Sequence, residues 1–179
     1  YTTYVQELTD ISGIYSTKRA FAALDEHGNV FVWGDNSYGG NQNDSVTPNI
    51  RVSNLIDISG IYSTQKAFVA LDIWGDIYMW GYSPGGGKFN VMKDDGDPLD
   101  PNLVLPIPVK IIKIISTTHA FTALQENGNI VIWGNHNYGG DHSLYAAQAG
   151  NNVKDIYSNE RAFAAVDGDG DVFVWGDDN

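Results

Sequence analysis

A chain of 179 residues, with 42% hydrophobic and 12% aromatic residues, is long enough to bury a core and too apolar for a disordered protein. Its 22 Asp and Glu outnumber 10 Lys and Arg, and the formal charge of −12 argues against direct binding of nucleic acid or anionic membranes. The acidity suits a protein partner with a basic surface, or serves solubility alone. No cysteine is present for disulfides or thiolate catalysis, and no apolar run reaches the ~20 residues of a membrane span.

The first predicted elements are three strands. The run LTDISGIYST at 8–17 predicts the first of them. AFAAL at 20–24 and VFVW at 30–33 are almost wholly apolar, with frequent β-branched or aromatic residues, which is typical of strands buried on both faces. The intervening DEHGN places Gly28 where a hairpin turn needs a positive φ. We therefore expect a β-hairpin preceded by a third strand.

The chain beyond this hairpin is less regular. WGDNSYGG at 33–40 is a Gly-rich loop, and NDSVTPNIRV at 43–52 predicts either a fourth strand or irregular chain. Much later, HSLYAAQAG at 142–150 alone suggests a helical turn. The connections between the regular segments thus differ in length and composition.

The three-strand unit recurs three more times. In every copy a Phe precedes a Trp by 12 residues, and a small Ala and a turn Gly keep their places between them. A constant unit joined by variable connections is typical of structural repeats. The four pairs are Phe21–Trp33, Phe68–Trp80, Phe121–Trp133 and Phe163–Trp175.

Three or four strands in each repeat of ~40–50 residues are typical of β-propeller blades. One such sheet cannot bury both faces alone, so the Trp residues are expected to pack between blades, where Ala23 and its equivalents would let the sheets approach. We expect a single repeat domain over 1–179, whose last repeat is completed by 1–7 or by chain outside this sequence. The repeats are placed at about 8–54, 55–107, 108–150 and 151–179.

These repeats resemble the regulator-of-chromosome-condensation repeat. WGDNSYG at 33–39 matches W-G-x-N-x-x-G, the centre of that family's pattern, residue for residue. The family's Leu position is occupied by Leu24, Leu71, Leu124 and Val166. The resemblance implies an all-β fold, a β-propeller built of four such repeats.

The chain also departs from the family. Ala and Phe replace the family's His-Ser pair, as in TKRAF, and Gly40 stands in place of a Gln. No functional residue of the family maps onto this chain. Nucleotide exchange on a small GTPase, an activity found in the family, is therefore not carried over.

The number of repeats bears on how the propeller closes. The family's rings usually have seven blades, and propellers in general have about four to eight. We expect an arc of four blades, completed by a longer parent chain, a second copy or a partner; the alternative is a small four-bladed ring. In an arc, the end blades would expose apolar faces with residues such as Phe21 and Val174.

No recognised catalytic motif is present, so we predict neither an enzyme nor a cofactor. The four histidines are too few and too scattered for a recurring catalytic or metal site; they are His27, His119, His136 and His142. His27 falls in a hairpin turn and is expected to be solvated. His119 is also expected to be a solvated polar residue, because its equivalents in the other repeats are Arg19, Lys66 and Arg161.

Two acidic stretches are the candidates for a metal. DGDGD at 167–171 superficially resembles a calcium loop, but Val172 stands where an EF-hand has its Gly, and the stretch is the repeat equivalent of the DEHGN turn. KDDGDPLD at 93–100 is a similar acidic insertion. A plain hairpin turn is the favoured interpretation of the first, and we predict no metal site.

The preferred function is a non-enzymatic protein-binding or scaffolding module that presents its loops to a partner. The alternative is a structural segment of a large tandem-repeat protein, extracellular or at the cell surface. Tyrosines in the Gly-rich loops add contact area, although they could equally pack the loops down. The candidate binding residues are Asn36, Tyr38, Tyr82, His136 and Tyr138.

Overall fold

The computed structural model describes residues 8–42, 45–46, 50–85, 109–140 and 152–177. These form four antiparallel sheets of three strands, one per repeat, here called blades 1 to 4 in chain order. Blade 1 consists of β1 (Ile11–Ser16), β2 (Ala20–Asp25) and β3 (Val30–Gly34), and blade 2 of β6 (Ile58–Ser63), β7 (Ala67–Asp72) and β8 (Ile77–Gly81). Blade 3 consists of β9 (Ile111–Ser116), β10 (Ala120–Gln125) and β11 (Ile130–Gly134), and blade 4 of β12 (Val153–Ser158), β13 (Ala162–Asp167) and β14 (Val172–Gly176). The all-β, propeller-blade prediction is confirmed.

Short elements follow the third strands. These are the 3-10 turns η1 (Asn36–Tyr38), η3 (Ser83–Gly85) and η4 (His136–Tyr138). The first connection also holds η2 (Val52–Asn54) and a separate two-stranded sheet of β4 (Ser45–Val46) and β5 (Ile50–Arg51). The expected fourth strand is thus replaced by two short strands that pair with each other. Residues 93–100 and 142–150 lie outside the described part. Within that part, no helix is long and apolar enough to span a bilayer.

Each blade is built on the predicted hairpin. Phe21 lies opposite Trp33 and their rings stack with centroids 5.6 Å apart; the other three pairs stack in the same way. The turn is closed by Asp25, whose carboxylate accepts the backbone N–H of His27 and of residue 29. Gly28 takes a φ of 80°, and its counterparts in the other blades are also positive. A constant Phe-to-Trp offset therefore corresponds to a constant hairpin register.

The hydrophobic cores lie between blades. Phe68 and Trp80 of blade 2 pack against Val32 of blade 1, and both aromatic side chains are at most 1% exposed. Equivalent clusters fill the interfaces between blades 2 and 3 and between blades 3 and 4. The small residues expected at the interfaces are buried, namely Ala23, Ala70, Ala123 and Ala165. The prediction of inter-blade Trp packing is therefore confirmed at the three internal interfaces.

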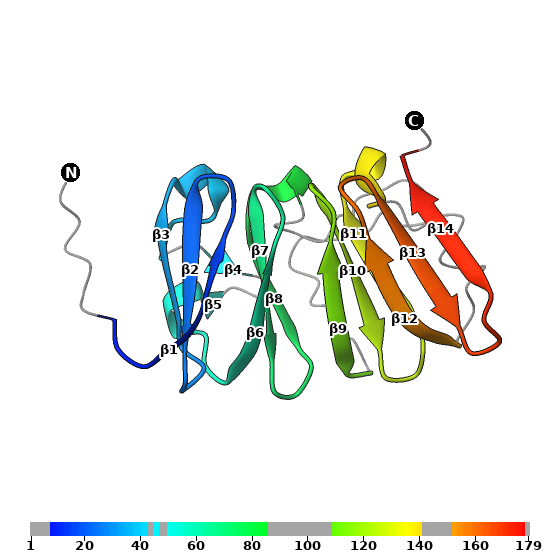
Figure 1. The fold of residues 1–179 in the computed structure, drawn as a ribbon. Helices are drawn as coiled ribbons and strands as arrows, with labels where there is room; N and C mark the ends of the chain where they lie inside the picture. The colour runs from blue at the N-terminus through cyan, green and yellow to red at the C-terminus, as the bar shows by residue number, and fades with distance from the viewer. Residues whose placement is uncertain (1–7, 43–44, 47–49, 86–108, 141–151, 178–179) are drawn as a thin grey trace.

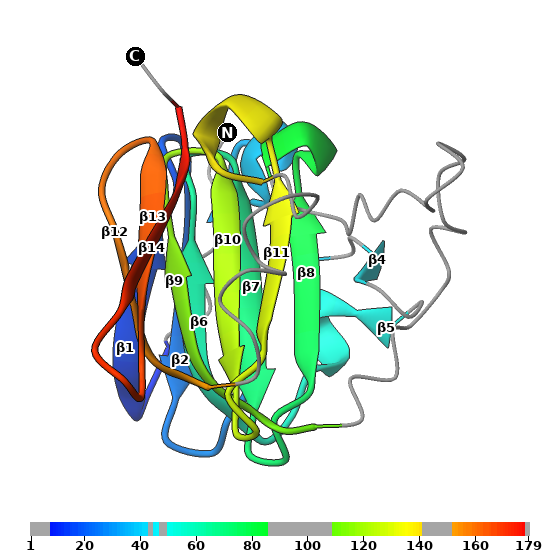
Figure 2. The ribbon, with the colours of Figure 1, turned by 90° about the vertical axis from the view of Figure 1, so that its right-hand side faces the viewer.

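The four blades stand side by side in a row, with blade 1 and blade 4 at opposite ends (Figure 1). Seen from the blade 4 end, β9 and β6 lie on one side, β10 and β7 in the middle, and β11 and β8 on the other side (Figure 2). One end of every blade, at the bottom of Figure 1, carries the hairpin turns 25–29, 72–76, 125–129 and 167–171, which we call the hairpin end. The opposite end, the loop face, carries the 3-10 turns η1, η3 and η4 and the turns 17–19, 64–66, 117–119 and 159–161.

The two ends of the row are open, as expected for an arc. Phe21 is 46% exposed, whereas its counterparts in blades 2 to 4 are at most 1% exposed. Val174 is 59% exposed, whereas its counterparts Val32, Met79 and Ile132 are at most 6% exposed. Blade 1 thus presents an uncovered face, the head, and blade 4 presents the opposite face, the tail. The structure has the form of an open arc and not of a small closed ring.

Candidate binding surface

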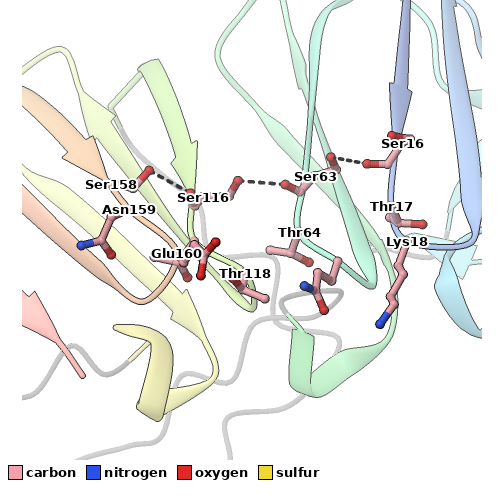
Figure 3. A pocket seen from close by; sticks show the side chains of 12 residues that line it. Ser16, Thr17, Lys18, Ser63, Thr64, Ser116, Thr118, Ser158, Asn159 and Glu160 are labelled. Atoms are coloured by element: carbon pink, nitrogen blue, oxygen red, sulfur yellow. Dashed lines mark hydrogen bonds between the residues drawn. The ribbon is translucent and has the colours of Figure 1, made fainter. Parts of the chain in front are cut away.

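A polar groove runs across all four blades where the first strands meet the loop face. It has a volume of about 450 Å³ and is lined by four equivalent triplets, at 16–18, 63–65, 116–118 and 158–160 (Figure 3). Each triplet begins with the Ser that ends a first strand. Each blade carries the sequence pattern Ile-x-Ser followed by Thr or, in blade 4, by Asn. This pattern places hydroxyl groups along the groove.

The serine hydroxyls of the groove join neighbouring blades. Ser63 Oγ donates to the carbonyl oxygen of Ser16, Ser116 Oγ to that of Ser63, and Ser158 Oγ to that of Ser116, each at 2.8 Å (Figure 3). Backbone groups of the same triplets bond in the opposite direction, as in the N–H of Lys18 donating to Gln65 O at 2.9 Å. The groove is therefore held rigidly by bonds that cross every interface.

Tyrosine rings and cations contact one another on the loop face. Tyr38 lies between Arg19 of its own blade, 5.5 Å from the ring centroid, and Lys66 of the next blade, at 5.6 Å. Lys66 also lies 4.6 Å from the Tyr82 ring centroid. Tyr138 repeats the arrangement, with Arg161 of blade 4 at 5.5 Å. Each distance is within the range of a cation–π interaction.

Threonine hydroxyls in the turns hold these tyrosines in place by donating to the tyrosines' backbone carbonyl oxygens. Thr17 Oγ1 donates to Tyr38 O at 3.1 Å, and Thr117 Oγ1 donates to Tyr138 O at 2.9 Å. The Asp35 carboxylate caps η1 by accepting the N–H of residue 37, and Gly39 ends it with a φ of 88°. Local capping chemistry thus sets the position of each ring relative to its cations.

The predicted site residues all lie on the loop face. Asn36 and His136 are exposed at the tips of η1 and η4, and Tyr82 is exposed. Tyr38 and Tyr138 are half-buried, so their rings both pack the loops and present an edge to solvent. The structure brings these residues onto one face, together with the cations Arg19, Lys66 and Arg161, which the sequence analysis did not name as binding residues.

His119 differs from the expectation of a solvated residue. Its ring lies 4.5 Å from that of Tyr138 and is half-buried, and its Nδ1 is buried with no hydrogen-bond partner in the described part of the chain. Burial, aided by the nearby charge of Lys66, lowers the pKa of His119 below its ordinary value of 6.5. The sequence analysis missed this burial because it depends on Tyr138, which lies in a later loop and contacts His119 only in the folded chain.

Charges separate between the two ends of the blades. Cations of the loop face are Lys18, Arg19, Lys66 and Arg161. Arg19 pairs with Asp35 at 3.2 Å and Arg161 with Asp177, whereas Lys66 contacts no carboxylate in the described residues. The hairpin end holds Lys110 and Lys154 but is rich in carboxylates, which include Asp10, Asp25, Glu26, Asp57, Asp72, Asp76, Glu126, Asp167, Asp169 and Asp171. Among the described residues, carboxylates are thus concentrated at the hairpin end, although Asp35, Glu160 and Asp177 lie at the loop face.

The DGDGD stretch forms the hairpin turn between β13 and β14. Asp167 Oδ1 accepts the backbone N–H groups of Asp169 and Asp171, as Asp25 does in blade 1. The hairpin interpretation of this stretch is therefore confirmed. In the part of the chain that the structure describes, no group of three or more potential ligands is placed to hold a metal ion.

Comparison with known proteins agrees with this geometry. The model of the regulator of chromosome condensation (RCC1) repeat matches residues 14–39, from β1 through η1. This match covers one of the four repeats of the chain. The resemblance expected from WGDNSYG is thereby confirmed, and the solved structures extend the likeness of fold to the other three blades.

Human WBSCR16 matches with a TM-score of 0.60 and 20% identity, over 93% of this chain and 47% of that chain. Yeast RCC1 (Prp20), solved bound to Kap60, matches with a TM-score of 0.60 and 19% identity, over 93% of this chain and 43% of that chain. The CRINKLY WD40 ectodomain of the Arabidopsis thaliana receptor kinase ACR4 matches with a TM-score of 0.52 and 12% identity, over 93% of this chain and 49% of that chain. At these identities the likeness shows the fold, and the chain spans less than half of each RCC1-like structure. None of the curated proteins matches.

Proposed function

We propose that this chain is a non-enzymatic protein-binding module and that its loop face makes the contact. The observation that carries the proposal is the set of tyrosine–cation contacts on the loop face, which join blades 1 and 2 through Tyr38 and Lys66 and blades 3 and 4 through Tyr138 and Arg161. Tyr and Arg contribute most of the binding energy at many protein interfaces. A ring already held beside a cation loses little conformational freedom on binding, which favours affinity.

The charges of this face indicate the chemistry of the partner. Among the described residues, the carboxylates, whose excess pointed to a partner with a basic surface, are concentrated at the hairpin end. On the loop face, Lys66 lies between two tyrosine rings without a carboxylate partner in the described residues. We infer that the partner segment at the loop face presents carboxylates or backbone carbonyls to this lysine.

The chemistry of the groove supports binding over catalysis. The hydroxyls of Ser63, Ser116 and Ser158 donate to backbone carbonyl oxygens of the preceding blade and hold the blades together. A nucleophilic serine instead needs a base that accepts its proton. Yeast RCC1, a protein of similar fold, is bound to Kap60 in its solved structure, which supports protein binding as one use of this fold.

The experiment compares binding by matched variants. The wild-type chain captures proteins from a lysate of the source cells, and the affinity of each captured protein is then measured with purified components. The double variant Tyr38→Ala/Tyr138→Ala should weaken specific binding by several hundred-fold, since two hot-spot contacts at ~2 kcal/mol, each about 30-fold, are removed. Lys66→Gln should weaken it by a smaller factor and reduce its dependence on salt.

The control carries the same number of changes at the hairpin end, in Asp76→Ala/Glu126→Ala, where both side chains are exposed. This variant should bind as the wild type does. Circular dichroism and thermal melts establish that all variants are folded. Full binding by the folded tyrosine variant, or loss of binding only in the hairpin-end variant, would contradict the proposal.

A further inference from the structure

The same contacts recur at each interface between neighbouring blades. The Ser hydroxyl of the later blade donates to the Ser carbonyl of the earlier one. The N–H of the turn in the earlier blade donates to the turn of the later one: Lys18 to Gln65 O, Gln65 to Thr118 O and Thr118 to Glu160 O, at 2.9 to 3.0 Å. The head of one blade and the tail of the preceding blade are therefore complementary in both directions.

Contacts at the hairpin end repeat in the same way. The N–H of Ile58 donates to Gly28 O at 3.1 Å, that of Ile111 to Gly75 O at 3.4 Å, and that of Val153 to Gly128 O at 3.1 Å. A Cβ on Gly28 would lie only 2.7 Å from the backbone of Ile58. The blades thus meet along their full length, from the groove to the hairpin turns.

The ends of the arc carry the two unmatched halves of this interface. At the head, the Ser16 hydroxyl has no hydrogen-bond partner in the described residues, and at the tail the N–H of Glu160 has none. A Cβ on Gly170, the last hairpin glycine, would meet nothing within 4 Å. Each group is the counterpart of one that is engaged at all three internal interfaces.

Apolar side chains mark the same two faces. At the head, Ile14 and Phe21 are 65% and 46% exposed, although their counterparts Ile61 and Phe68 are 3% and 0% exposed. At the tail, Tyr157, Val172 and Val174 are exposed. Such patches usually mark an interaction surface. These exposed side chains are equivalent to the ones that pack between neighbouring blades inside the chain.

We propose that the occupant of each end face is a second copy of this chain, so that two arcs close one eight-bladed ring. In that ring, Ser16 Oγ of each copy donates to Ser158 O of the other, and the N–H of Glu160 donates to Lys18 O. Phe21 packs on the tail at Val174, as Phe68 packs on Val32. A head-to-tail contact that occurs twice about a two-fold axis forms a closed assembly, and eight blades lie within the range that propellers adopt.

Light scattering on the purified 179-residue chain tests this proposal. The wild type should elute as a dimer with twice the mass of the 19.6 kDa chain. Phe21→Glu at the head and Val174→Glu at the tail should each give a folded monomer, since either change places two carboxylates in the ring's interfaces. Asn127→Glu, in an exposed hairpin turn, is the matched control and should remain dimeric.

Mixing the two monomeric variants gives the most specific result. The intact tail of the Phe21→Glu chain and the intact head of the Val174→Glu chain restore one of the two interfaces, so the mixture should regain dimers. Ser16→Ala should weaken the dimer about tenfold through two lost hydrogen bonds, whereas Ser53→Ala should leave it unchanged. A wild-type monomer, an open series of larger masses, or a mixture that stays monomeric would each overturn the proposal.

Discussion

Thr122 places a hydroxyl among the buried side chains of β10. It is fully buried, and its hydroxyl has no hydrogen-bond partner among the described residues. The equivalent positions hold Ala22, Val69 and Ala164, so blade 2 already accommodates a valine there. Because a buried hydroxyl without a partner is unfavourable, Thr122→Val should raise the free energy of unfolding by about 1–2 kcal/mol in urea titrations.

Thr64→Val is the matched control for this substitution. The Thr64 hydroxyl is also buried, but it donates to Gly85 O at 2.7 Å and accepts the N–H of Ala67 at 3.1 Å. Its loss leaves both groups unpaired, so stability should fall by about 1–3 kcal/mol. Equal effects of the two substitutions would contradict the assignment of the Thr122 hydroxyl as unpaired.

His119 predicts how stability depends on pH. Its pKa lies below 6.5 in the folded chain because burial disfavours the charged ring. The unfolded chain therefore binds a proton at a higher pH than the folded chain does. The contribution of His119 is present above pH 6.5 and is lost as the pH falls toward the folded pKa.

The urea midpoint of the wild type should therefore fall between about pH 7 and about pH 5. His119→Gln, which keeps a polar side chain without a titrating ring, should show a smaller fall over the same range. An NMR titration of the imidazole measures the pKa directly. A pKa above 6.5 for this ring would contradict the account.

At the level of the elements, two hairpin turns have the same backbone conformation, but only one of them contacts a neighbouring blade. Gly28 and Gly170 occupy the same turn position with φ values of 80° and 90°. A Cβ at Gly28 would meet the backbone of Asp57 and Ile58 within 2.8 Å, whereas at Gly170 it would meet nothing within 4 Å. Alanine at either position strains the turn, but only at Gly28 does it also push the next blade away.

Gly170→Ala should therefore lower the free energy of unfolding by about 1 kcal/mol, the cost of a positive φ for a residue with a Cβ. Gly28→Ala should lower it by about 2 kcal/mol more, since backbone cannot move aside as a flexible side chain does. Both are measured in the Phe21→Glu background, where the tail is not covered by a second copy. Equal losses would show that the blades do not meet at their hairpin turns.

Much of the element structure was predictable from the sequence. The constant offset between Phe21 and Trp33 and its repeats required a fixed hairpin register, because a slip by one residue would turn the apolar side chains to the other face. The turn glycines and the small Ala23 followed from the same pattern. Local chemistry, repeated four times, determined these features.

The tyrosine–cation contacts were not predictable in the same way. Lys66 and Tyr38 come from different blades, and their contact exists only once blade 2 packs on blade 1. The one signal in the sequence was the recurrence of Arg or Lys just before the second strand, with His119 as the exception. That His119 is buried depends on Tyr138, which follows a different strand.

At the scale of the whole molecule, the arc has four distinct surfaces: the loop face, the hairpin end, the head and the tail. The loop face carries the tyrosine–cation contacts, the hairpin end carries most carboxylates of the described residues, and the head and tail carry the apolar patches. Because these surfaces differ in their side chains, a substitution on one of them should change binding there and leave binding at the others unchanged. Phe21→Glu, for example, should abolish self-association without reducing binding at the loop face.

Hydrogen exchange of the chain, alone and saturated with a captured partner, tests whether the loop face is the binding surface. Backbone amides report where a partner excludes water, without any substitution. Protection on binding should concentrate in η1, η4 and the turns at 64–66 and 159–161, while the hairpin turns at 72–76 and 125–129 should exchange as in the free chain. Protection confined to the hairpin turns, or to the head and tail faces, would contradict the proposal.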